Sequence, residues 1–379
     1  MSKLTFFCIL ISSMMPVSAS ALREWTDTAW TRVMKEFYSP KTGGIYVCAP
    51  EDVQPARDFP GGLLKQEFGY GKGLEDCAII GGVALSGLVD AHAMTQSRTF
   101  AADAEKVARG LLNLVNAHPY RGYVARGLCV EDGTSICRLS SRDQVTHWVH
   151  GLWRYWRSGL VPAKMKPAIR TAFADVAGLM ERNVTEANGW NFLQADGTPD
   201  PRGVCKMRQT HPHEAARLAM IYAAAGEITG DSRWTAHYTS LKEEAIKGSC
   251  ALSEMPQDRI RWLMPEYTLL QMNTSLELLL AVEQDKESRA GIITAMTACA
   301  RLARERAGKI RSADSGCLCA CAEVHLAQMM TPQSAFTWDD GQRAILENAI
   351  THVPAGKVGA CRAVHLFAAY WRAKRLNRL

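Results

Sequence analysis

The sequence predicts an all-α protein built from repeated helical hairpins. Apolar residues recur at spacings of three and four along almost the whole chain, which is the period of an amphipathic helix. Apart from short hairpins in the connecting loops, no stretch alternates apolar and polar residues as a strand does. Long and short connectors alternate between the predicted helices, so the chain repeats as a pair of helices of roughly 60 residues, used six times.

The helical pattern divides into twelve segments. They are expected at 22–38, 74–95, 98–117, 141–158, 163–185, 212–229, 232–247, 266–284, 286–306, 318–330, 339–352 and 359–376. Prolines mark several starts, and Gly230-Asp231-Ser232 separates two segments. Loops of roughly 20–35 residues precede the second, fourth, sixth and eighth segments, and loops of that length are usually functional. Because these loops recur at one phase of the repeat, they should all lie at one end of the molecule.

The N-terminal segment has the organisation of a signal peptide. Lys3 precedes an apolar run over 4–15, and a small-residue cleavage site follows at 19–21. The run is too short to span a bilayer, so we expect export to the periplasm or medium after cleavage near Ala21, with no stable membrane anchor. No later stretch is expected to cross a membrane, and 22–379 is predicted to form a single catalytic domain.

Charge and cysteine content narrow the possibilities further. The formal net charge is +6, without a lysine-rich run or basic repeat, so nucleic acid is not an expected partner. Of the 12 cysteines, Cys129 and Cys137 flank an Asp-Gly turn that predicts a hairpin, which would let them form a disulfide. Cys77, Cys299 and Cys361 lie in helical patterns and are expected to be buried as small apolar residues. The oligomeric state is left open.

Six helical hairpins with long loops before the even-numbered helices resemble the (α/α)6 toroid of the six-hairpin glycosidase superfamily. The resemblance covers nearly the whole chain after the signal peptide, and it is one of architecture. It implies that the even-numbered helices form an inner ring inside an outer ring. It also implies that their N-terminal ends line an active-site funnel, with short β-hairpins in the long loops. The superfamily includes many glycoside hydrolases, and related toroids occur in polysaccharide lyases.

Acidic residues stand where that funnel is expected, at the starts of the second and fourth helices. Glycoside hydrolysis needs two carboxyl groups facing one bond. Asp143 lies between Arg142 and Gln144, polar neighbours that favour its ionised form, so it suits the base or nucleophile. Glu75 or Asp76 leads into an apolar helix, where burial would favour the protonated form that a general acid requires. Adjacent helical residues point about 100° apart, so one of the two should face the cavity, and we favour Asp76. The two roles can be exchanged, and acids in a first turn also serve as ordinary helix caps.

Other polar and aromatic residues at the same phase are candidates for sugar binding, because aromatic faces and planar polar groups grip sugars. They are Arg142, Gln144, His147, Trp148, Tyr70, Trp190, His211, His213, Glu214, Trp262 and Tyr267. Metal ligands on helices normally stand three or four residues apart, which neither His211 and His213 nor the Cys317, Cys319, Cys321 and His325 group matches. We therefore expect no metal and no cofactor.

Basic residues outnumber acidic ones in the long loops. The basic ones are Arg121, Arg126, Arg138, Arg202, Lys206, Arg208, Arg259, Arg261, Lys309 and Arg311, against Glu131, Asp132, Asp196, Asp200, Asp258 and Asp314. If these loops share one mouth, it is electropositive and favours uronate-bearing or sulfated glycans. The alternative is charge scattered over a solvated surface.

These observations favour an exported glycoside hydrolase with a carbohydrate substrate and paired-carboxylate catalysis. A polysaccharide lyase, acting by β-elimination with a tyrosine or histidine base such as Tyr267, His211 or His213, is the first alternative. A non-catalytic glycan-binding toroid and a sugar isomerase or epimerase, which needs several funnel histidines, are the others. The glycan, its linkage and the anomeric outcome are not encoded in any recognisable pattern.

Overall fold

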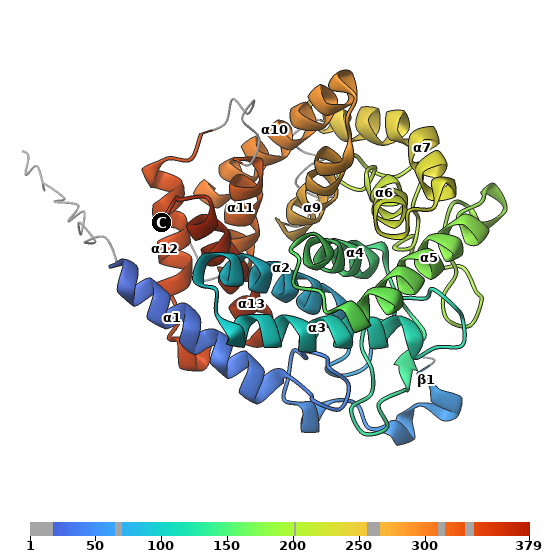
Figure 1. Cartoon of the computed structure of the whole chain (residues 1–379), viewed down its shortest axis with the longest axis horizontal. Helices are drawn as coiled ribbons and strands as arrows, with labels where there is room; N and C mark the ends of the chain where they lie inside the picture. The colour runs from blue at the N-terminus through green and yellow to red at the C-terminus, as the bar shows by residue number, and fades with distance from the viewer. Residues whose placement is uncertain (1–17, 65–69, 201, 256–265, 310–314, 330–336) are drawn as a thin grey trace, which may run out of the picture.

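The computed structural model describes residues 18–64, 70–200, 202–255, 266–309, 315–329 and 337–379, and within them twelve α-helices form two concentric rings (Figure 1). The inner ring consists of α2 (Cys77–Thr95), α4 (Arg142–Arg157), α6 (Arg217–Thr229), α9 (Glu266–Val282), α11 (Ser315–Gln328) and α13 (Ala360–Arg375). The outer ring consists of α1 (Ala19–Arg32), α3 (Arg98–Asn116), α5 (Lys166–Asn183), α7 (Ser232–Cys250), α10 (Lys286–Lys309) and α12 (Asp340–Thr351). Each inner helix contacts the next, and α13 contacts α2, which closes the ring. This is the predicted (α/α)6 toroid.

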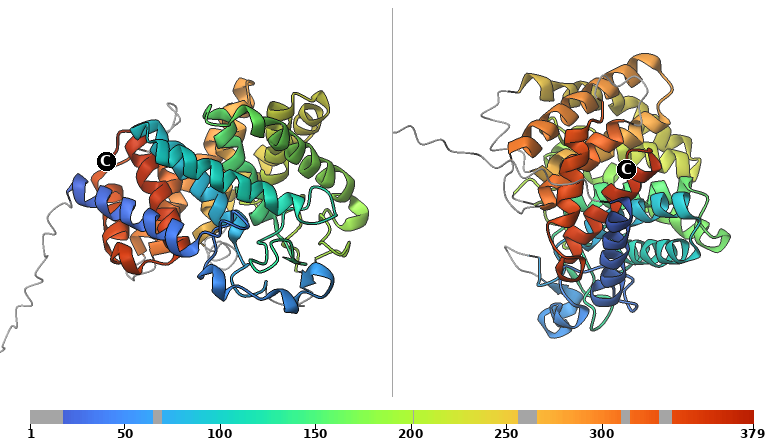
Figure 2. Two further views of the ribbon diagram at one scale, coloured as in Figure 1. Left: turned by 60° about the horizontal axis from the view of Figure 1, so that its bottom comes forward. Right: turned by 90° about the vertical axis from the view of Figure 1, so that its left-hand side faces the viewer.

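The loops before the early inner helices gather on one side of the rings, as Figure 2 shows for the segments that precede α2, α4 and α6. Their few strand residues form β1 (Leu63–Leu64) and β2 (Ile136–Cys137), which pair in parallel. An antiparallel bridge between Leu128 and Ile136 confirms the hairpin that the Asp-Gly turn predicted. The alternation of connector lengths predicted that these long loops share one end of the molecule, and the loops before α2, α4 and α6 do so.

The disulfide expected in that hairpin is absent. Cys129 and Cys137 are both buried, and they are not joined to each other. The backbone N–H of Cys129 donates to the carbonyl of Ser135 at 2.8 Å, so the hairpin register sets Cys129 opposite Ser135 instead of Cys137. Cys77 and Cys299 are buried, as predicted, but Cys361 is exposed, so the prediction for that residue was wrong.

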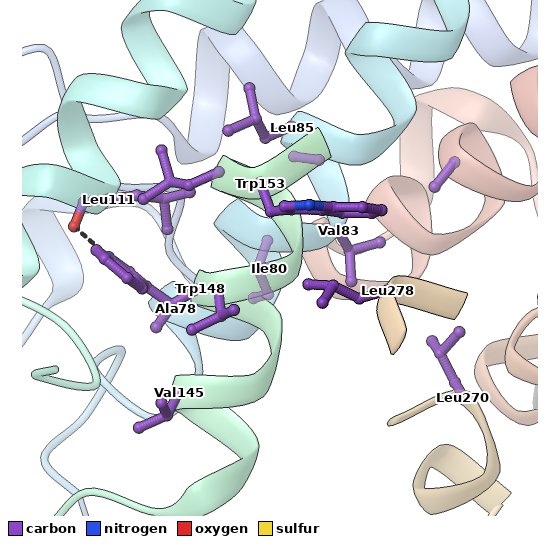
Figure 3. Close-up of a cluster of buried hydrophobic side chains, with 14 of the residues drawn as sticks. Ala78, Ile80, Val83, Leu85, Leu111, Val145, Trp148, Trp153, Leu270 and Leu278 are labelled. Carbon is purple, nitrogen blue, oxygen red and sulfur yellow. Dashed lines mark hydrogen bonds between the residues drawn. The ribbon is translucent and has the colours of Figure 1, made fainter. Parts of the chain in front are cut away.

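Helices α2 and α4 pack with their backbones in contact. A Cβ on Gly82 of α2 would lie 2.1 Å from the carbonyl oxygen of His147, and one on Gly151 of α4 would lie 2.6 Å from the Gly82 carbonyl oxygen. Only glycine permits such an approach. Around this contact Ala78, Ile80 and Val83 of α2 pack with Val145 and Trp148 of α4 (Figure 3). The contact sets the distance between the first turns of the two helices, where the acidic candidates lie.

Helix α2 corrects one expectation. Its 19 residues are long and apolar enough to cross a membrane by length and composition, although no such stretch was expected beyond the N-terminus. In the structure α2 is an inner helix, and 78% of its most apolar 18-residue stretch is buried. Its apolar character on all sides is therefore explained by burial within the protein.

Two helix starts differ from the predicted ones. Helix α1 begins at Ala19, inside the proposed cleavage site, with the Ser18 hydroxyl accepting a hydrogen bond from the Ala21 N–H at 3.2 Å. Helix α6 begins at Arg217 instead of residue 212, because residues 212–216 form turns. The five-residue shift moves Arg217 into the first turn of an inner helix.

Helix α1 covers the seam between the two ends of the chain. The Trp25 indole N–H donates to the Val353 carbonyl at 2.7 Å, and Arg32 donates to the Val358 carbonyl. Trp30 stacks on Phe367 of α13 with ring centroids 4.6 Å apart. The outer ring is thus completed by contacts between residues more than 300 positions apart in the sequence.

Candidate active site

The first turns of four inner helices meet at one end of the ring. Arg217 of α6 donates through Nη1 to Asp143 of α4 and through Nη2 to Gln271 of α9, the latter at 2.8 Å. Tyr267, one turn before Gln271, is 53% exposed. Partial burial and the charges of Asp143 and Asp76 raise the pKa of Tyr267, so both carboxylates act electrostatically on its hydroxyl. We call Asp76, Asp143, Arg217, Tyr267 and Gln271 the mouth layer.

Both predicted catalytic aspartates belong to this layer. Asp76 occupies the N-cap position of α2, where its Oδ1 accepts from Gln144 Nε2 at 2.8 Å and from Arg126 Nη1 at 3.4 Å. The side chain of Asp76 is 42% exposed and that of Asp143 is 27% exposed. The burial that was expected to favour a protonated Asp76 is therefore not present.

Glu75 differs from Asp76 in its surroundings. Its Oε2 is buried and has no hydrogen-bond partner among the described residues, and its charge acts on the buried thiol of Cys77 and on Cys48. The backbone carbonyl of Glu75 accepts from Gln144 and Arg126 at 3.0 and 2.8 Å. Glu75 thus anchors the start of α2, while the Asp76 carboxylate lies beside Tyr267.

Arg142 and Glu214, two predicted sugar ligands, bind each other. Arg142 Nη2 donates to Glu214 Oε1, and Arg142 Nη1 donates to the carbonyls of Gly203 and Lys206 at 2.5 and 3.3 Å. Burial by itself raises the pKa of Glu214. The hydrogen bond with His213 and the charges of Arg142 and Arg217 outweigh this effect and lower the pKa to about 2. The pair ties α4 to the loop before α6 and so orients the neighbouring Asp143.

The two histidines of that loop lie together. His211 and His213 stack with ring centroids 5.8 Å apart and planes at 3°. His213 is buried, with Nε2 3.4 Å from Glu214 Oε1, and the backbone N–H of His211 donates to Glu214 Oε2 at 3.4 Å. No group of three or more histidine, cysteine or acidic side chains with metal-binding geometry occurs among the described residues.

The aromatic candidates divide into different environments. Tyr70 lies beside Asp76, with the Arg126 guanidinium 3.6 Å from its ring centroid and its hydroxyl accepting from Arg202 at 2.9 Å. Trp190 lies under Arg208, 4.4 Å from that guanidinium. Trp262 lies outside the described residues.

Trp148 corrects the prediction that it binds sugar. It is fully buried, its indole N–H donates to the Leu111 carbonyl of outer helix α3 at 2.8 Å, and its ring packs 5.0 Å from that of Phe173. It faces the outer ring and belongs to the core.

The basic loop residues are largely paired with acids. Arg126, Arg138 and Arg202 contact Asp76, Asp196 and Asp200, all within 3.4 Å. Arg121 and Arg208 pair with Asp175 and Glu244 on outer helices. Arg259, Arg261 and Arg311 lie outside the described residues. The guanidiniums of Arg126 and Arg202, each paired with an acid, both lie against the ring of Tyr70.

A second layer lies deeper along the axis. His147 of α4 is buried, and burial together with the charges of His365, His150 and Arg217 lowers its pKa. Burial lowers the pKa of His365 on α13, but Cys361 and Glu323 raise it, to about 9. Burial raises the pKa of Glu323 on α11, whose Oε2 has no hydrogen-bond partner among the described residues. We call His147, His365 and Glu323 the middle layer.

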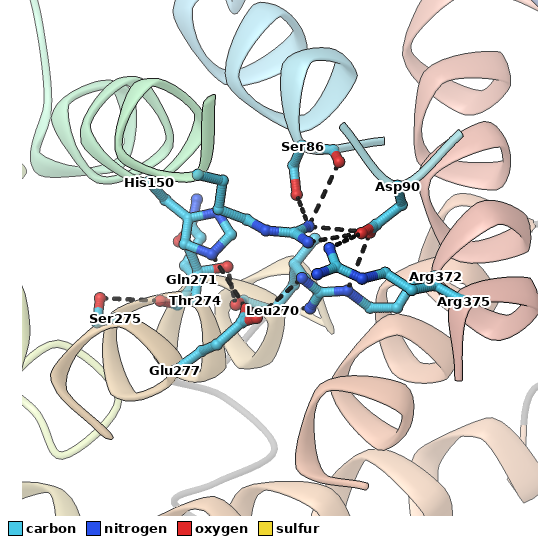
Figure 4. Close-up of polar contacts among 11 residues, drawn as sticks. Ser86, Asp90, His150, Leu270, Gln271, Thr274, Ser275, Glu277, Arg372 and Arg375 are labelled. Carbon is cyan, nitrogen blue, oxygen red and sulfur yellow. Dashed lines mark hydrogen bonds and ion pairs between the residues drawn. The ribbon is translucent and has the colours of Figure 1, made fainter. Parts of the chain in front are cut away.

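The far end of the ring is closed by buried ion pairs (Figure 4). Asp90 of α2 accepts from Arg154 at 2.6 and 3.0 Å and from Arg375 at 2.6 Å. Arg372 binds Glu277 at 2.9 and 3.0 Å, and Glu277 contacts His150 at 3.0 Å. Since the C-terminal halves of α2, α4 and α13 meet here, these three inner helices run parallel.

Comparisons with known proteins agree with this architecture. No protein-family model and no curated protein matches the sequence. The solved structure of cellobiose 2-epimerase from Spirochaeta thermophila DSM 6192 is similar, with a TM-score of 0.51 and 13% sequence identity, over 95% of this chain and 98% of that one. At this identity the likeness concerns the fold, and the fold is the (α/α)6 toroid that the helical repeat predicted.

Proposed function

We propose that this chain is an exported glycoside hydrolase that cleaves an acidic oligosaccharide or polysaccharide at the mouth layer. The observation that carries the proposal is the placement of Asp76 and Asp143 on adjoining inner helices. Both are partly exposed, and the charges of both raise the pKa of Tyr267. Two carboxyl groups that reach one glycosidic bond are the requirement for its hydrolysis.

The contacts suit the two aspartates to different roles. Asp143 is ion-paired with the buried Arg217, which fixes the position of its carboxylate, as the role of base or nucleophile requires. Asp76 has one amide donor and one guanidinium at 3.4 Å, and solvent covers much of the rest. In the proposed role Asp76 is the general acid, which donates a proton to the leaving oxygen of the bound sugar.

The surroundings of Asp76 support an acidic substrate. Tyr70 offers an aromatic face, and the guanidiniums of Arg126 and Arg202 lie 3.6 and 5.4 Å from its ring centroid. A carboxylate or sulfate on the sugar would accept hydrogen bonds from such groups.

The test is to incubate the purified chain with matched neutral and uronate-bearing oligosaccharides and to measure new reducing ends. We expect release from the acidic set, and loss of release in Asp143→Asn and Asp76→Asn with folding intact. Asp27→Asn, on an exposed pair with Arg23, is the matched control. Products with the ultraviolet absorbance of an unsaturated uronate would instead identify a lyase, and unchanged turnover in Asp143→Asn would refute the assignment.

A sugar epimerase is the second candidate, favoured by the middle layer. Burial keeps His147 neutral, the form that can accept a proton from a sugar carbon, and His365 lies beside it. The similarity to a cellobiose 2-epimerase fold agrees with this alternative. An epimerase would incorporate solvent deuterium into the sugar and release no new reducing end, whereas a hydrolase does the reverse.

A further inference from the structure

Asp76 stands at the N-cap of α2, but its side chain does not cap the helix. An aspartate at this position ordinarily accepts a hydrogen bond from the second or third N–H of its own helix. In α2, all of whose residues the structure describes, the Asp76 side chain makes no such bond. The Ala78 N–H donates instead to the backbone carbonyl of Arg126 at 3.0 Å. This substitute acceptor leaves the Asp76 carboxylate available to other donors.

Gln144 of α4 is one of the two side chains that hold this carboxylate. Its Nε2 donates to Asp76 Oδ1 at 2.8 Å and to the Glu75 carbonyl at 3.0 Å. Arg126 Nη1 reaches the same two oxygen atoms, at 3.4 and 2.8 Å. We propose that Gln144 is a positioning residue that orients Asp76 for proton donation, an inference that rests on the hydrolase function proposed above.

The side-chain amide of Gln144 can face α2 in one orientation only. Both atoms that it contacts are acceptors, so Nε2 must point toward them, and the reversed amide would set Oε1 against the Asp76 carboxylate. Gln144 is fully buried, and its Oε1 has no hydrogen-bond partner among the described residues. A buried acceptor without a partner costs about 1–3 kcal/mol. The contacts with α2, and not the needs of the amide itself, therefore determine how this side chain lies.

The same hydrogen bonds determine which oxygen of Asp76 carries the proton when the side chain is protonated. Gln144 and Arg126 both donate to Oδ1, and an oxygen that already accepts N–H groups is the poorer site for a proton. No described residue makes a hydrogen bond to Oδ2, and the Asp76 side chain is 42% exposed. The proton therefore lies on Oδ2. From there it passes to the leaving oxygen, which also receives the electron pair of the broken carbon–oxygen bond.

Gln144 also links the two carboxylates of the mouth layer, because it directly follows Asp143 in the chain. Adjacent helical residues point about 100° apart. Asp143 accordingly turns to Arg217 of α6, while Gln144 turns to Asp76 of α2. The first turn of α4 thus carries one carboxylate and holds the other. The distance between the two, which decides whether both reach one glycosidic bond, depends on the Gln144 contact.

Dependence on the leaving group distinguishes impaired proton donation from a general loss of structure. A general acid matters most for a poor leaving group such as phenol, and little for dinitrophenol, which departs as an anion without protonation. The probes are phenyl and dinitrophenyl glucuronide, in the anomer that the wild-type chain cleaves, with the folded full-length chain. Asp76→Asn should lower kcat strongly for phenyl glucuronide and far less for dinitrophenyl glucuronide.

Gln144→Met keeps a side chain of similar size and removes the amide donor. We expect kcat for phenyl glucuronide to fall by about 10- to 100-fold, because general acid catalysis is worth roughly 10²–10⁴-fold and a misplaced acid retains part of it. The loss for dinitrophenyl glucuronide should stay below about 3-fold. KM should change little, since the buried Gln144 touches no sugar. A second variant, Gln144→Glu, keeps the shape but presents an oxygen to the same acceptors, so it should cause the same selective loss.

Gln194→Met is the matched control. Gln194 is also fully buried beside the start of α4, where its Oε1 accepts from the Ser140 N–H at 2.7 Å, but it binds no carboxylate among the described residues. Its replacement should lower stability without favouring one leaving group over the other, and circular dichroism confirms that each variant is folded.

The outcomes separate this inference from the function on which it rests. If folded Gln144→Met and Gln144→Glu lose the same factor on both glucuronides, or lose nothing, while Asp76→Asn shows the selective loss, the positioning role of Gln144 is wrong and the role of Asp76 stands. If Asp76→Asn itself loses the same factor on both, Asp76 is not the general acid, and the proposed hydrolase mechanism fails together with this inference.

Discussion

Asp90 is the carboxylate on which the ion pairs of the closed end depend, and its replacement by asparagine gives a quantitative test. Its side chain is 1% exposed and it binds Arg154 and Arg375, with Arg372 Nε at 3.6 Å. Asp90→Asn keeps the shape of the side chain and removes the charge. Three guanidiniums then remain with Glu277 as the nearby buried anion, and uncompensated buried charge is costly.

The magnitude follows from the electrostatics of the folded state. Burial raises the pKa of Asp90, but Arg154, Arg372 and Arg375 lower it, from 3.8 to about 2. At about 1.4 kcal/mol per unit, that difference corresponds to about 2.5 kcal/mol of folding free energy at neutral pH. Removing one partner from a buried pair costs about 3–5 kcal/mol in other proteins. We therefore expect Asp90→Asn to lower the free energy of unfolding by about 2–5 kcal/mol.

Urea unfolding followed by circular dichroism measures this loss. Asp27→Asn is the matched control, because its exposed pair with Arg23 should contribute less than about 1 kcal/mol. Since the folded pKa of Asp90 is depressed, its contribution is complete above pH 3.8 and disappears as the pH falls toward 2. A loss below about 1 kcal/mol at neutral pH, or a difference from wild type that persists unchanged at pH 2, would refute the reasoning.

Three further predictions concern the packing and the site. Gly82→Ala should destabilise the chain by at least about 1–3 kcal/mol in thermal unfolding, because its Cβ meets backbone, whereas Gly356→Ala, with open space around it, should have little effect. Glu214→Gln should cost about 2–3 kcal/mol at neutral pH, and the difference from wild type should shrink as the pH falls from 4.5 toward 2, where the wild-type carboxylate itself becomes protonated. Trp148→Phe should lower the free energy of unfolding by about 1–3 kcal/mol, because the indole N–H loses its hydrogen bond to the Leu111 carbonyl of α3. The substrate KM should not change, because this bond lies away from the mouth layer. A raised KM at unchanged stability would contradict the assignment of Trp148 to the core.

The fold was predictable because its information is periodic. Apolar spacing identified all twelve helices, and the alternation of connector lengths identified which ends share the loops. Boundaries were less predictable where capping and turns compete with periodicity. Ser18 extends α1 by a turn before the predicted start, and the turns at 212–216 delay α6 to Arg217. Neither effect changes the order or pairing of the helices.

The site was only partly predictable. The loop phase correctly predicted that Asp76, Asp143 and Tyr267 would lie at one end of the ring, but it carries no information on their side-chain partners. Arg217 was missed because the predicted helix start placed it in the second turn, and Gln271 because a glutamine within an apolar helix carries no spacing signal. Cys361 was expected to be buried because it lies in a helical pattern, but it is exposed in the first turn of α13.

The contacts of α1 with the segment between α12 and α13 have a consequence for how the chain folds. The hydrogen bonds from Trp25 and Arg32 join residues 328 and 326 positions apart, so they form only when nearly the entire chain is in place. Each hairpin, in contrast, is built from local contacts and can form early. The assembly should therefore pass through an open arc whose two free edges are the apolar faces of α1 and α13. The lifetime of that arc, more than the stability of any hairpin, would set how long the chain is exposed to aggregation.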